Sequence, residues 1–305
     1  DSSDHFETLS HNWHFWLPFV GATLLGLCLQ TVNKEMHQVS VGHVLDRLQN
    51  HQGRLPFGNW LVQFFGGIVC LITGQSVGRE GPAVHLGAGA ASQLGQWLQL
   101  PHNSLRTLIG CGVAAAIAAS FNTPMAGVIF AMEVVLMEYT ITGFIPVILA
   151  SVSGAAITQL IFDEGVAFDI TNVQLSSLWE LPYIVLSGVL IAAFAAVFIR
   201  LQVLASRLNH LPIALRLSAA GFLTGTVAIF VPQIMGVGYD TVTAAILGEV
   251  SLNLLIAIIV AKLVVTALSI GLGMPGGVIG PMFVIGACLG SALGLIGNIL
   301  LPEQA

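Results

Sequence analysis

The sequence predicts an all-helical integral membrane protein, and its composition, its small residues and an internal repeat support that prediction. Hydrophobic residues make up 55% of the 305 positions and charged residues 8%, against roughly 25% charged residues in soluble proteins. The mean hydropathy is +0.89. The chain contains 34 glycines, and small residues let membrane helices pack closely. We therefore expect a densely packed bundle of membrane helices.

A series of apolar segments follows along the chain, and each is a candidate for a membrane helix. They span residues 13–32, 59–77, 81–100, 105–137, 141–162, 178–204, 213–232, 241–248, 252–272 and 276–301. Some approach the ~20 residues that a full crossing of the bilayer needs, whereas others are short or broken by glycine. Runs of glycine and alanine at 87–91 and 114–119 favour close helix contacts. Because the gaps are short, we expect a single transmembrane domain over residues 1–305.

An internal repeat indicates that this domain consists of two related halves. Residues 74–95 match residues 273–294 without a gap at nine of 22 positions. The matching pairs are Gly74/Gly273, Gly78/Gly277, Gly81/Gly280, Pro82/Pro281, Gly87/Gly286, Ala88/Ala287, Ser92/Ser291, Leu94/Leu293 and Gly95/Gly294. We expect a first repeat over about residues 13–162 and a second over about 178–305. Doubled Gly-Pro helix starts in apolar sequence are typical of an ion or solute pathway at a repeat interface.

The charges of the connections predict an orientation in the membrane. Residues 33–58 and 200–216 each carry three basic residues, whereas 163–180 carries four acidic residues and no basic one. The positive-inside rule places the two basic connections in the cytoplasm and 163–180 outside. The acidic start, residues 1–7, is expected outside as well.

The two repeated helix starts have the features of an anion site. Residues 78–82 read Gly-Arg-Glu-Gly-Pro and residues 277–281 read Gly-Val-Ile-Gly-Pro. Proline in the first turn sacrifices no hydrogen bond, and the glycines let an ion approach the backbone. The unpaired N–H groups of a helix start, with about half a positive charge behind them, attract an anion. For a single motif we would favour simple helix punctuation, but the doubled motif favours two starts that converge on one anion.

Glu80 adds a carboxylate to the first of these starts. Ionisable residues within membrane segments are costly and are functional candidates. This carboxylate can occupy the place of the anion and leave when protonated, which would make it a gate. The alternative is a structural salt bridge to Arg79 or another charge. We expect Arg79 to anchor the loop or tune the field at the entrance rather than to bind the ion.

Other functional classes find little support in the sequence. Nine lysine and arginine residues are too few for a nucleic-acid surface. The cysteines stand alone in apolar segments and are expected to be small core residues, so we predict no metal site and no cofactor; they are Cys28, Cys70, Cys111 and Cys288. Metalloprotease, hydrolase and nucleotide-binding motifs are missing, so an enzyme is not expected. His85, as a lone histidine, is more often a packing residue than a pathway residue.

Three motifs together resemble those of a known family. They are residues 78–82, residues 121–127 (Phe-Asn-Thr-Pro-Met-Ala-Gly) and residues 275–281 (Pro-Gly-Gly-Val-Ile-Gly-Pro). In order and spacing they are similar to the motifs of the CLC family of chloride channels and chloride/proton exchangers, and the resemblance covers about residues 57–300. It implies a CLC-type bundle of many tilted and broken helices built from two inverted repeats. It also implies a multi-pass homodimer with one anion pathway per subunit, in the cell membrane and most simply the bacterial inner membrane.

The resemblance assigns roles to the residues of the two helix starts. It implies that Glu80 is the external gate and that backbone N–H groups bind chloride or a similar anion; the implied ligands are Glu80, Gly81, Val278, Ile279 and Gly280. Residues that would line or support the pathway are Gly78, Arg79, Pro82, Gly277 and Pro281. The serine motif of the family, Gly-Ser-Gly-Ile-Pro, has no counterpart in residues 35–44; Ser40 or His43 is a candidate neighbour of the site, without an assigned role. The pathway tyrosine of the family falls beyond residue 305, so we expect a chain truncated before the last helices of the family.

Position 134 decides the expected transport mode. Proton-coupled members commonly carry two consecutive glutamates after the motif at 121–127, and the alignment places Glu133 and Val134 there. Valine cannot carry a proton, so the internal proton site is lost and passive, channel-like conduction is favoured; the alternative is a chloride/proton antiporter. Glu133 is expected to be a buried structural carboxylate, about 100° round a helix from Val134. Weaker alternatives are a fluoride or other halide exporter and a membrane enzyme.

Overall fold

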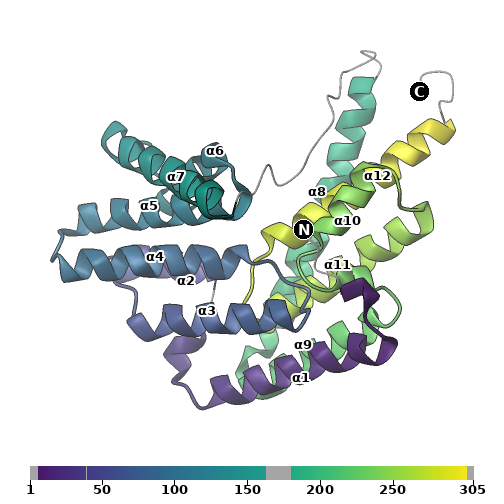
Figure 1. The fold of residues 1–305 in the computed structure, drawn as a ribbon, viewed down its shortest axis with the longest axis horizontal. Coiled ribbons are helices and arrows are strands. Elements are labelled where there is room, and N and C mark those ends of the chain that lie inside the picture. The colour runs from purple at the N-terminus through teal and green to yellow at the C-terminus, as the bar shows by residue number, and fades with distance from the viewer. Residues whose placement is uncertain (1–5, 39, 163–179, 301–305) are drawn as a thin grey trace.

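The computed structural model describes residues 6–38, 40–162 and 180–300, and helices dominate this part of the chain (Figure 1). The first half contains α1 (His11–Gln30), α2 (Ser40–Asn50), α3 (Phe57–Ile72), α4 (Glu80–Trp97), α5 (His102–Phe121), α6 (Pro124–Phe130), the π-helix η3 (Ala131–Leu136) and α7 (Ile141–Phe162). The second contains α8 (Glu180–Ser206), α9 (Ile213–Ala228), α10 (Tyr239–Ile246), α11 (Leu252–Gly271) and α12 (Ile279–Leu300). Short 3-10 helices are η1 (Phe6–Thr8), η2 (Lys34–His37), η4 (Arg207–His210) and η5 (Pro232–Ile234). The all-helical prediction is confirmed.

Five helical stretches of the described chain are long and apolar enough to cross a membrane. They are His102–Phe121, Ile141–Phe162, Leu181–His210, Leu252–Gly271 and Ile279–Gly297. The apolar segment 105–137 is divided among α5, α6 and η3. It breaks because Asn122 adopts a left-handed conformation with φ of 53° and Pro124 begins the next helix.

Two pairs of helices begin at the repeat offset of the sequence. Ser40 and Tyr239 begin α2 and α10, and Glu80 and Ile279 begin α4 and α12; each pair is 199 residues apart. Figure 1 shows α4, α5 and α7 grouped at one end of the molecule and α8, α10, α11 and α12 at the other. α1 packs along α9 and thereby joins the halves. The expected repeat boundaries at 162 and 178 stay predictions.

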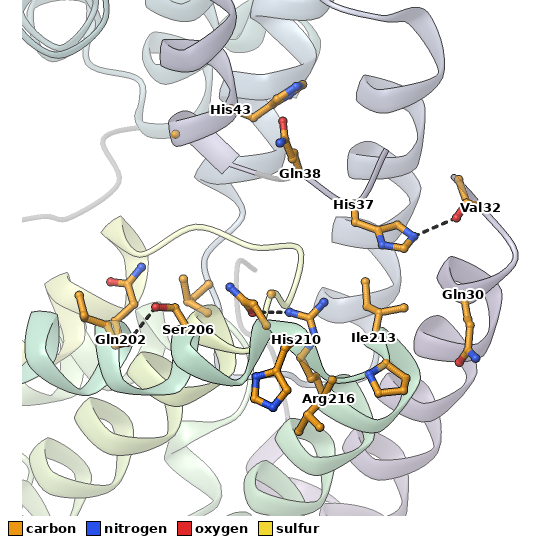
Figure 2. Close-up of a pocket in the computed structure, with 18 of the residues that line it drawn as sticks. Gln30, Val32, His37, Gln38, His43, Gln202, Ser206, His210, Ile213 and Arg216 are labelled. Carbon is orange, nitrogen blue, oxygen red and sulfur yellow. Dashed lines mark hydrogen bonds between the residues drawn. The ribbon is translucent and has the colours of Figure 1, made fainter. Parts of the chain in front are cut away.

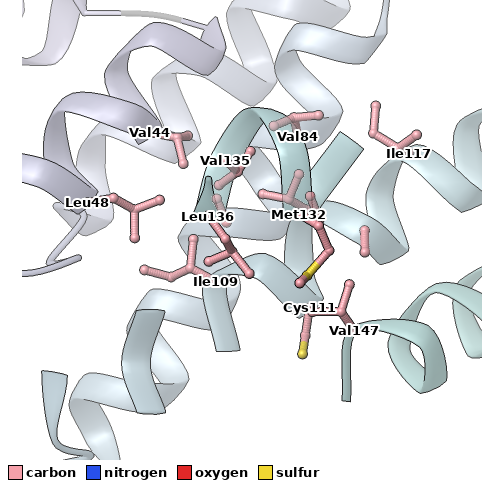
Figure 3. Close-up of a cluster of buried hydrophobic side chains, with 14 of the residues drawn as sticks. Val44, Leu48, Val84, Ile109, Cys111, Ile117, Met132, Val135, Leu136 and Val147 are labelled. Atoms are coloured by element: carbon pink, nitrogen blue, oxygen red, sulfur yellow. The ribbon is translucent and has the colours of Figure 1, made fainter. Parts of the chain in front are cut away.

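Each half has a hydrophobic cluster of its own, and a further cluster combines buried residues of both halves. In the first half, side chains of α2, α4, α5, η3 and α7 converge (Figure 3); they include Val44, Val84, Ile109, Met132 and Val147. A second cluster joins α8, α10, α11 and α12. One cysteine departs from its expected place, since Cys28 is exposed on α1 whereas Cys70, Cys111 and Cys288 are buried. Cys28 is therefore not a core residue within the described chain.

Candidate functional site

The two repeated helix starts lie directly against each other. The N–H of Gly78 donates to the carbonyl of Gly277 at 2.7 Å, and the N–H of Gly277 donates to the carbonyl of Gly78 at 2.6 Å. Only glycine fits at this crossing. A Cβ on Gly81 would lie 2.7 Å from the carbonyl carbon of Gly276 and 2.9 Å from the nitrogen of Gly277. The starts of α4 and α12 therefore face each other, as the repeat predicts.

Each start presents backbone donors that its own helix does not use. The first hydrogen bonds at these starts run from Ala83 to the carbonyl of Arg79, at 3.1 Å, and from Met282 to the carbonyl of Val278, at 3.0 Å. The N–H groups of four earlier residues have no acceptor within their own helix; these early donors belong to Glu80, Gly81, Ile279 and Gly280. Pro82 and Pro281 have no N–H. Unused donors from both halves thus stand at two helix starts that are in contact.

The Glu80 carboxylate occupies the space between the two starts. Its side chain is fully buried. A Cβ on Gly277 would lie 2.8 Å from Oε2, and one on Gly280 would lie 3.0 Å from Oε1. Oε1 accepts a hydrogen bond from the hydroxyl of Tyr239 at 3.1 Å, whereas Oε2 has no hydrogen-bond partner among the described residues. A buried carboxylate oxygen without a partner is costly.

Arg79 takes partners other than its neighbour Glu80. Its Nη2 donates to the carbonyl of Ser120 at the end of α5, at 2.8 Å. Its guanidinium lies over the ring of Tyr239, with Cζ 5.3 Å from the ring centroid. Among the described residues, no ion pair within 4 Å joins Arg79 to Glu80. The alternative of a structural salt bridge between these two residues therefore has no support.

Tyr239 and Lys262 are site residues that the sequence reasoning missed. Tyr239 is the first residue of α10 and reaches the first half of the chain. Lys262 of α11 is fully buried, and its Nζ donates to the carbonyls of Ile234 and Gly236 at 3.3 and 3.2 Å. The internal repeat is the signal that could have pointed to Tyr239, because this residue stands 199 positions after Ser40, the candidate neighbour of the site in the first half.

His85 is a member of a buried polar chain, not an isolated packing residue. Nε2 of His85 lies 2.8 Å from Nδ1 of His43, and the rings stack at 5.1 Å. Arg47 donates from Nε to Nε2 of His43 at 3.1 Å. Because arginine can only donate, Nδ1 of His43 carries the hydrogen and donates to His85. Burial, with a smaller effect of the Arg47 guanidinium, lowers the pKa of His43 to about 4, so His43 is neutral at pH 7.

A cavity of about 1100 Å³ is lined by His43 and by other residues of the two basic connections, 33–58 and 200–216. Figure 2 shows His37 and His43 on one side of it and Gln202, His210 and Arg216 on the other. It thus joins residues of both connections for which the sequence predicts a cytoplasmic location.

Glu133 and Val134 are consecutive residues of the π-helix η3. Both are exposed in the described chain, whereas Met132 and Val135 beside them are buried. The expectation that Glu133 is buried is therefore wrong. Residues 131–136 form a π-helix, so the α-helical spacing of 100° per residue on which the expected angle rests does not apply to them.

Comparisons with known proteins agree with the sequence motifs. A model of the voltage gated chloride channel family matches residues 21–305. A putative chloride channel protein ClcB-like from Ralstonia nicotianae is 31% identical over 299 residues, which cover 95% of this chain and 69% of that protein.

Solved structures share the fold. A CLC-type fluoride/proton antiporter has a TM-score of 0.79 at 24% identity, over 94% of this chain and 72% of that one. A slow cyanobacterial Cl⁻/H⁺ antiporter has a TM-score of 0.84 at 21% identity, over 97% and 71%. A eukaryotic CLC transporter has a TM-score of 0.72 at 23% identity, over 92% and 52%. The chain therefore has the all-helical, CLC-type membrane fold that the resemblance implies.

Proposed function

This chain belongs to the CLC family of voltage-gated chloride channels, and from that membership we propose a pathway for chloride or a similar small anion with Glu80 as its gate. The chain is a multi-pass membrane protein for anion transport and not an enzyme. The proposed anion ligands are the early backbone donors of α4 and α12, together with Val278 at the second start.

One observation carries this proposal: the Glu80 carboxylate lies between two helix starts from the two halves of the chain. Each start provides unpaired N–H groups and about half a positive charge. An anion at this point would exchange its hydration shell for fixed donors without meeting a counter-charge that traps it. A carboxylate in the same place competes with the anion. Protonation removes its charge and favours its departure, which opens the pathway.

We propose passive conduction as the transport mode. A proton that crosses about 30 Å of hydrocarbon needs titratable groups or water within hydrogen-bonding reach. Val134 has no titratable group and cannot serve at the internal relay position. Proton-coupled exchange is the second candidate, because two structural relatives are described as antiporters. Because one of these relatives is a fluoride/proton antiporter, fluoride is a weaker alternative for the transported ion.

We also propose a homodimer in the bacterial inner membrane. α7 and α8 present broad apolar surfaces, with Leu160 and Val185 exposed by 86% and 67%. Such surfaces suit lipid or a second copy of the chain. Cross-linking of the protein in native membranes would test the dimer.

The transport proposal can be tested in liposomes with chloride and pH electrodes in the same chamber. We expect the wild type to release chloride without uphill proton movement, and the release to slow as external pH rises. Glu80→Gln, which mimics the protonated gate, should release chloride at a rate independent of external pH. Glu138→Gln, at an exposed carboxylate, is the matched control.

Two results would count against this proposal. Sustained uphill proton movement under an imposed chloride gradient would refute passive conduction and establish exchange. An unchanged pH dependence in Glu80→Gln would return Glu80 to a structural role.

A further inference from the structure

Tyr239 contacts the gate from the opposite half of the chain. We propose that its hydroxyl holds the Glu80 carboxylate in the closed position, so that Tyr239 sets how readily the gate opens. This proposal rests on the glutamate-gated function above.

The contact has the geometry of a charge-assisted hydrogen bond. The hydroxyl of Tyr239 donates to Oε1 of Glu80 at 3.1 Å, and the carboxylate is fully buried. Oε2 has no partner among the described residues. The hydroxyl is therefore the side-chain donor that offsets the desolvation of this carboxylate. Hydrogen bonds to ionised groups are about twice as strong as neutral ones.

The second half of the chain positions Tyr239 through a buried lysine. Lys262 donates to the carbonyls of Ile234 and Gly236, which directly precede α10. Gly238, the residue before Tyr239, has a left-handed conformation with φ of 81°, and a Cβ there would lie 2.9 Å from Nζ of Lys262. The backbone that leads to Tyr239 is thus fixed by Lys262 and by a turn that requires glycine.

The first half fixes the ring of Tyr239 through Arg79. The guanidinium lies 5.3 Å from the ring centroid and is itself bound to the carbonyl of Ser120. Cation–π contacts of this kind contribute more when they are removed from water. The ring is therefore held between Arg79 and the start of α10, with its hydroxyl toward Glu80.

The groups around the Glu80 carboxylate determine in which direction loss of the Tyr239 hydroxyl shifts the pH dependence of chloride release. Arg79 stands beside Glu80, and Lys262 is bonded to the segment before Tyr239. Residues 279–282 of α12, Ile-Gly-Pro-Met, carry no titratable side chain; the first turn of α10 also contains Asp240. The Tyr239 hydroxyl stabilises the ionised, closed form of Glu80. Without this donor, protonation and opening should occur at a higher external pH.

The test compares Tyr239→Phe with the wild type, alone and combined with Glu80→Gln, by chloride release from liposomes over a range of external pH. Phenylalanine keeps the ring beneath Arg79 and removes only the hydroxyl. We expect about tenfold faster release at alkaline external pH, and a half-maximal pH about one unit higher. In the Glu80→Gln background, the same change should have no effect. Tyr139→Phe, at a side chain that is 71% exposed, is the matched control.

Each alternative result is decisive. If Glu80→Gln alters release and Tyr239→Phe does not, the gate stands and the role of Tyr239 is refuted. If Tyr239→Phe speeds release equally in the Glu80→Gln background, the hydroxyl acts elsewhere and the proposal fails. If Glu80→Gln itself leaves the pH dependence unchanged, the proposed gate is refuted.

A second variant guards against a folding defect in Tyr239→Phe. Tyr239→Gln keeps a hydrogen-bond donor without the ring, so its release rate at alkaline pH should lie between those of the wild type and a fully open Glu80→Gln. A rate equal to that of Glu80→Gln would contradict the proposal. The melting temperatures of all variants, measured in the same detergent, identify any loss of folded protein.

Discussion

Gly87→Ala should separate α4 from α5, whereas the same change at the repeat-equivalent Gly286 should be harmless. A Cβ on Gly87 would lie 2.9 Å from the carbonyl carbon of Gly112 and 3.0 Å from Cβ of Ala116. Apart from its chain neighbours and the backbone of its own helix, no described residue lies within 4 Å of a Cβ on Gly286. Both glycines are inside helices, so the two substitutions gain the same helix propensity and differ in packing.

The expected magnitude follows from these distances. Ordinary contacts between carbon atoms are about 3.5–4.0 Å, so a Cβ on Gly87 would overlap both neighbours by roughly 0.5 Å or more. Overpacking costs about 1–3 kcal/mol, and the upper end applies because the carbonyl of Gly112 is backbone and cannot rotate away. Alanine gains about 1 kcal/mol over glycine in a helix. We expect a loss of about 2 kcal/mol for Gly87→Ala and a gain of up to about 1 kcal/mol for Gly286→Ala.

The assay is thermal unfolding of both purified variants in one detergent. For a chain of 305 residues, a difference of about 3 kcal/mol corresponds to an apparent melting temperature roughly 5 °C lower for Gly87→Ala than for Gly286→Ala. Chloride release should persist in Gly286→Ala. Equal melting temperatures would refute the conclusion that backbone contact between α4 and α5 makes glycine necessary at position 87.

Two further predictions concern buried hydrogen bonds. The hydroxyls of Ser76 and Thr266 lie 2.9 Å apart and fully buried, so Thr266→Val should lower the unfolding free energy by ~1–3 kcal/mol by leaving Ser76 unpaired. Adding Ser76→Ala should recover part of that loss, and strictly additive losses in thermal unfolding would contradict this. His43→Ala should cost ~2–4 kcal/mol, because it opens a cavity and removes the partner of Arg47 and His85. His43→Asn, which keeps a donor and an acceptor, should lose less in the same measurement, and an equal loss would argue against the hydrogen-bond chain.

The gate region shows how far sequence reasoning reached. The doubled motif and the carboxylate at position 80 were sufficient to predict that two helix starts converge, because the capping chemistry of Gly-Pro starts is local. Tyr239 was not predictable in this way. Its contact with Glu80 spans 159 residues and depends on the fold of the segment that Lys262 holds. The exposure of Glu133 was not predictable for a related reason, because it depends on which side chains of η3 pack inward, and those are its neighbours Met132 and Val135.

The sequence by itself determined the membrane environment, the helical class and the two facing helix starts. These follow from the cost of exposing polar backbone to lipid and from unpaired donors at helix ends, which depend on composition and near neighbours. Only the tertiary structure decided which partners the buried groups take. Gly87 and Gly286 are equivalent in the repeat, yet only Gly87 meets another backbone within the described chain. His85 likewise acquires a polar role only because α2 brings His43 within 2.8 Å. Such pairings depend on shape and distance between segments far apart in the chain, and no local pattern of residues encodes them.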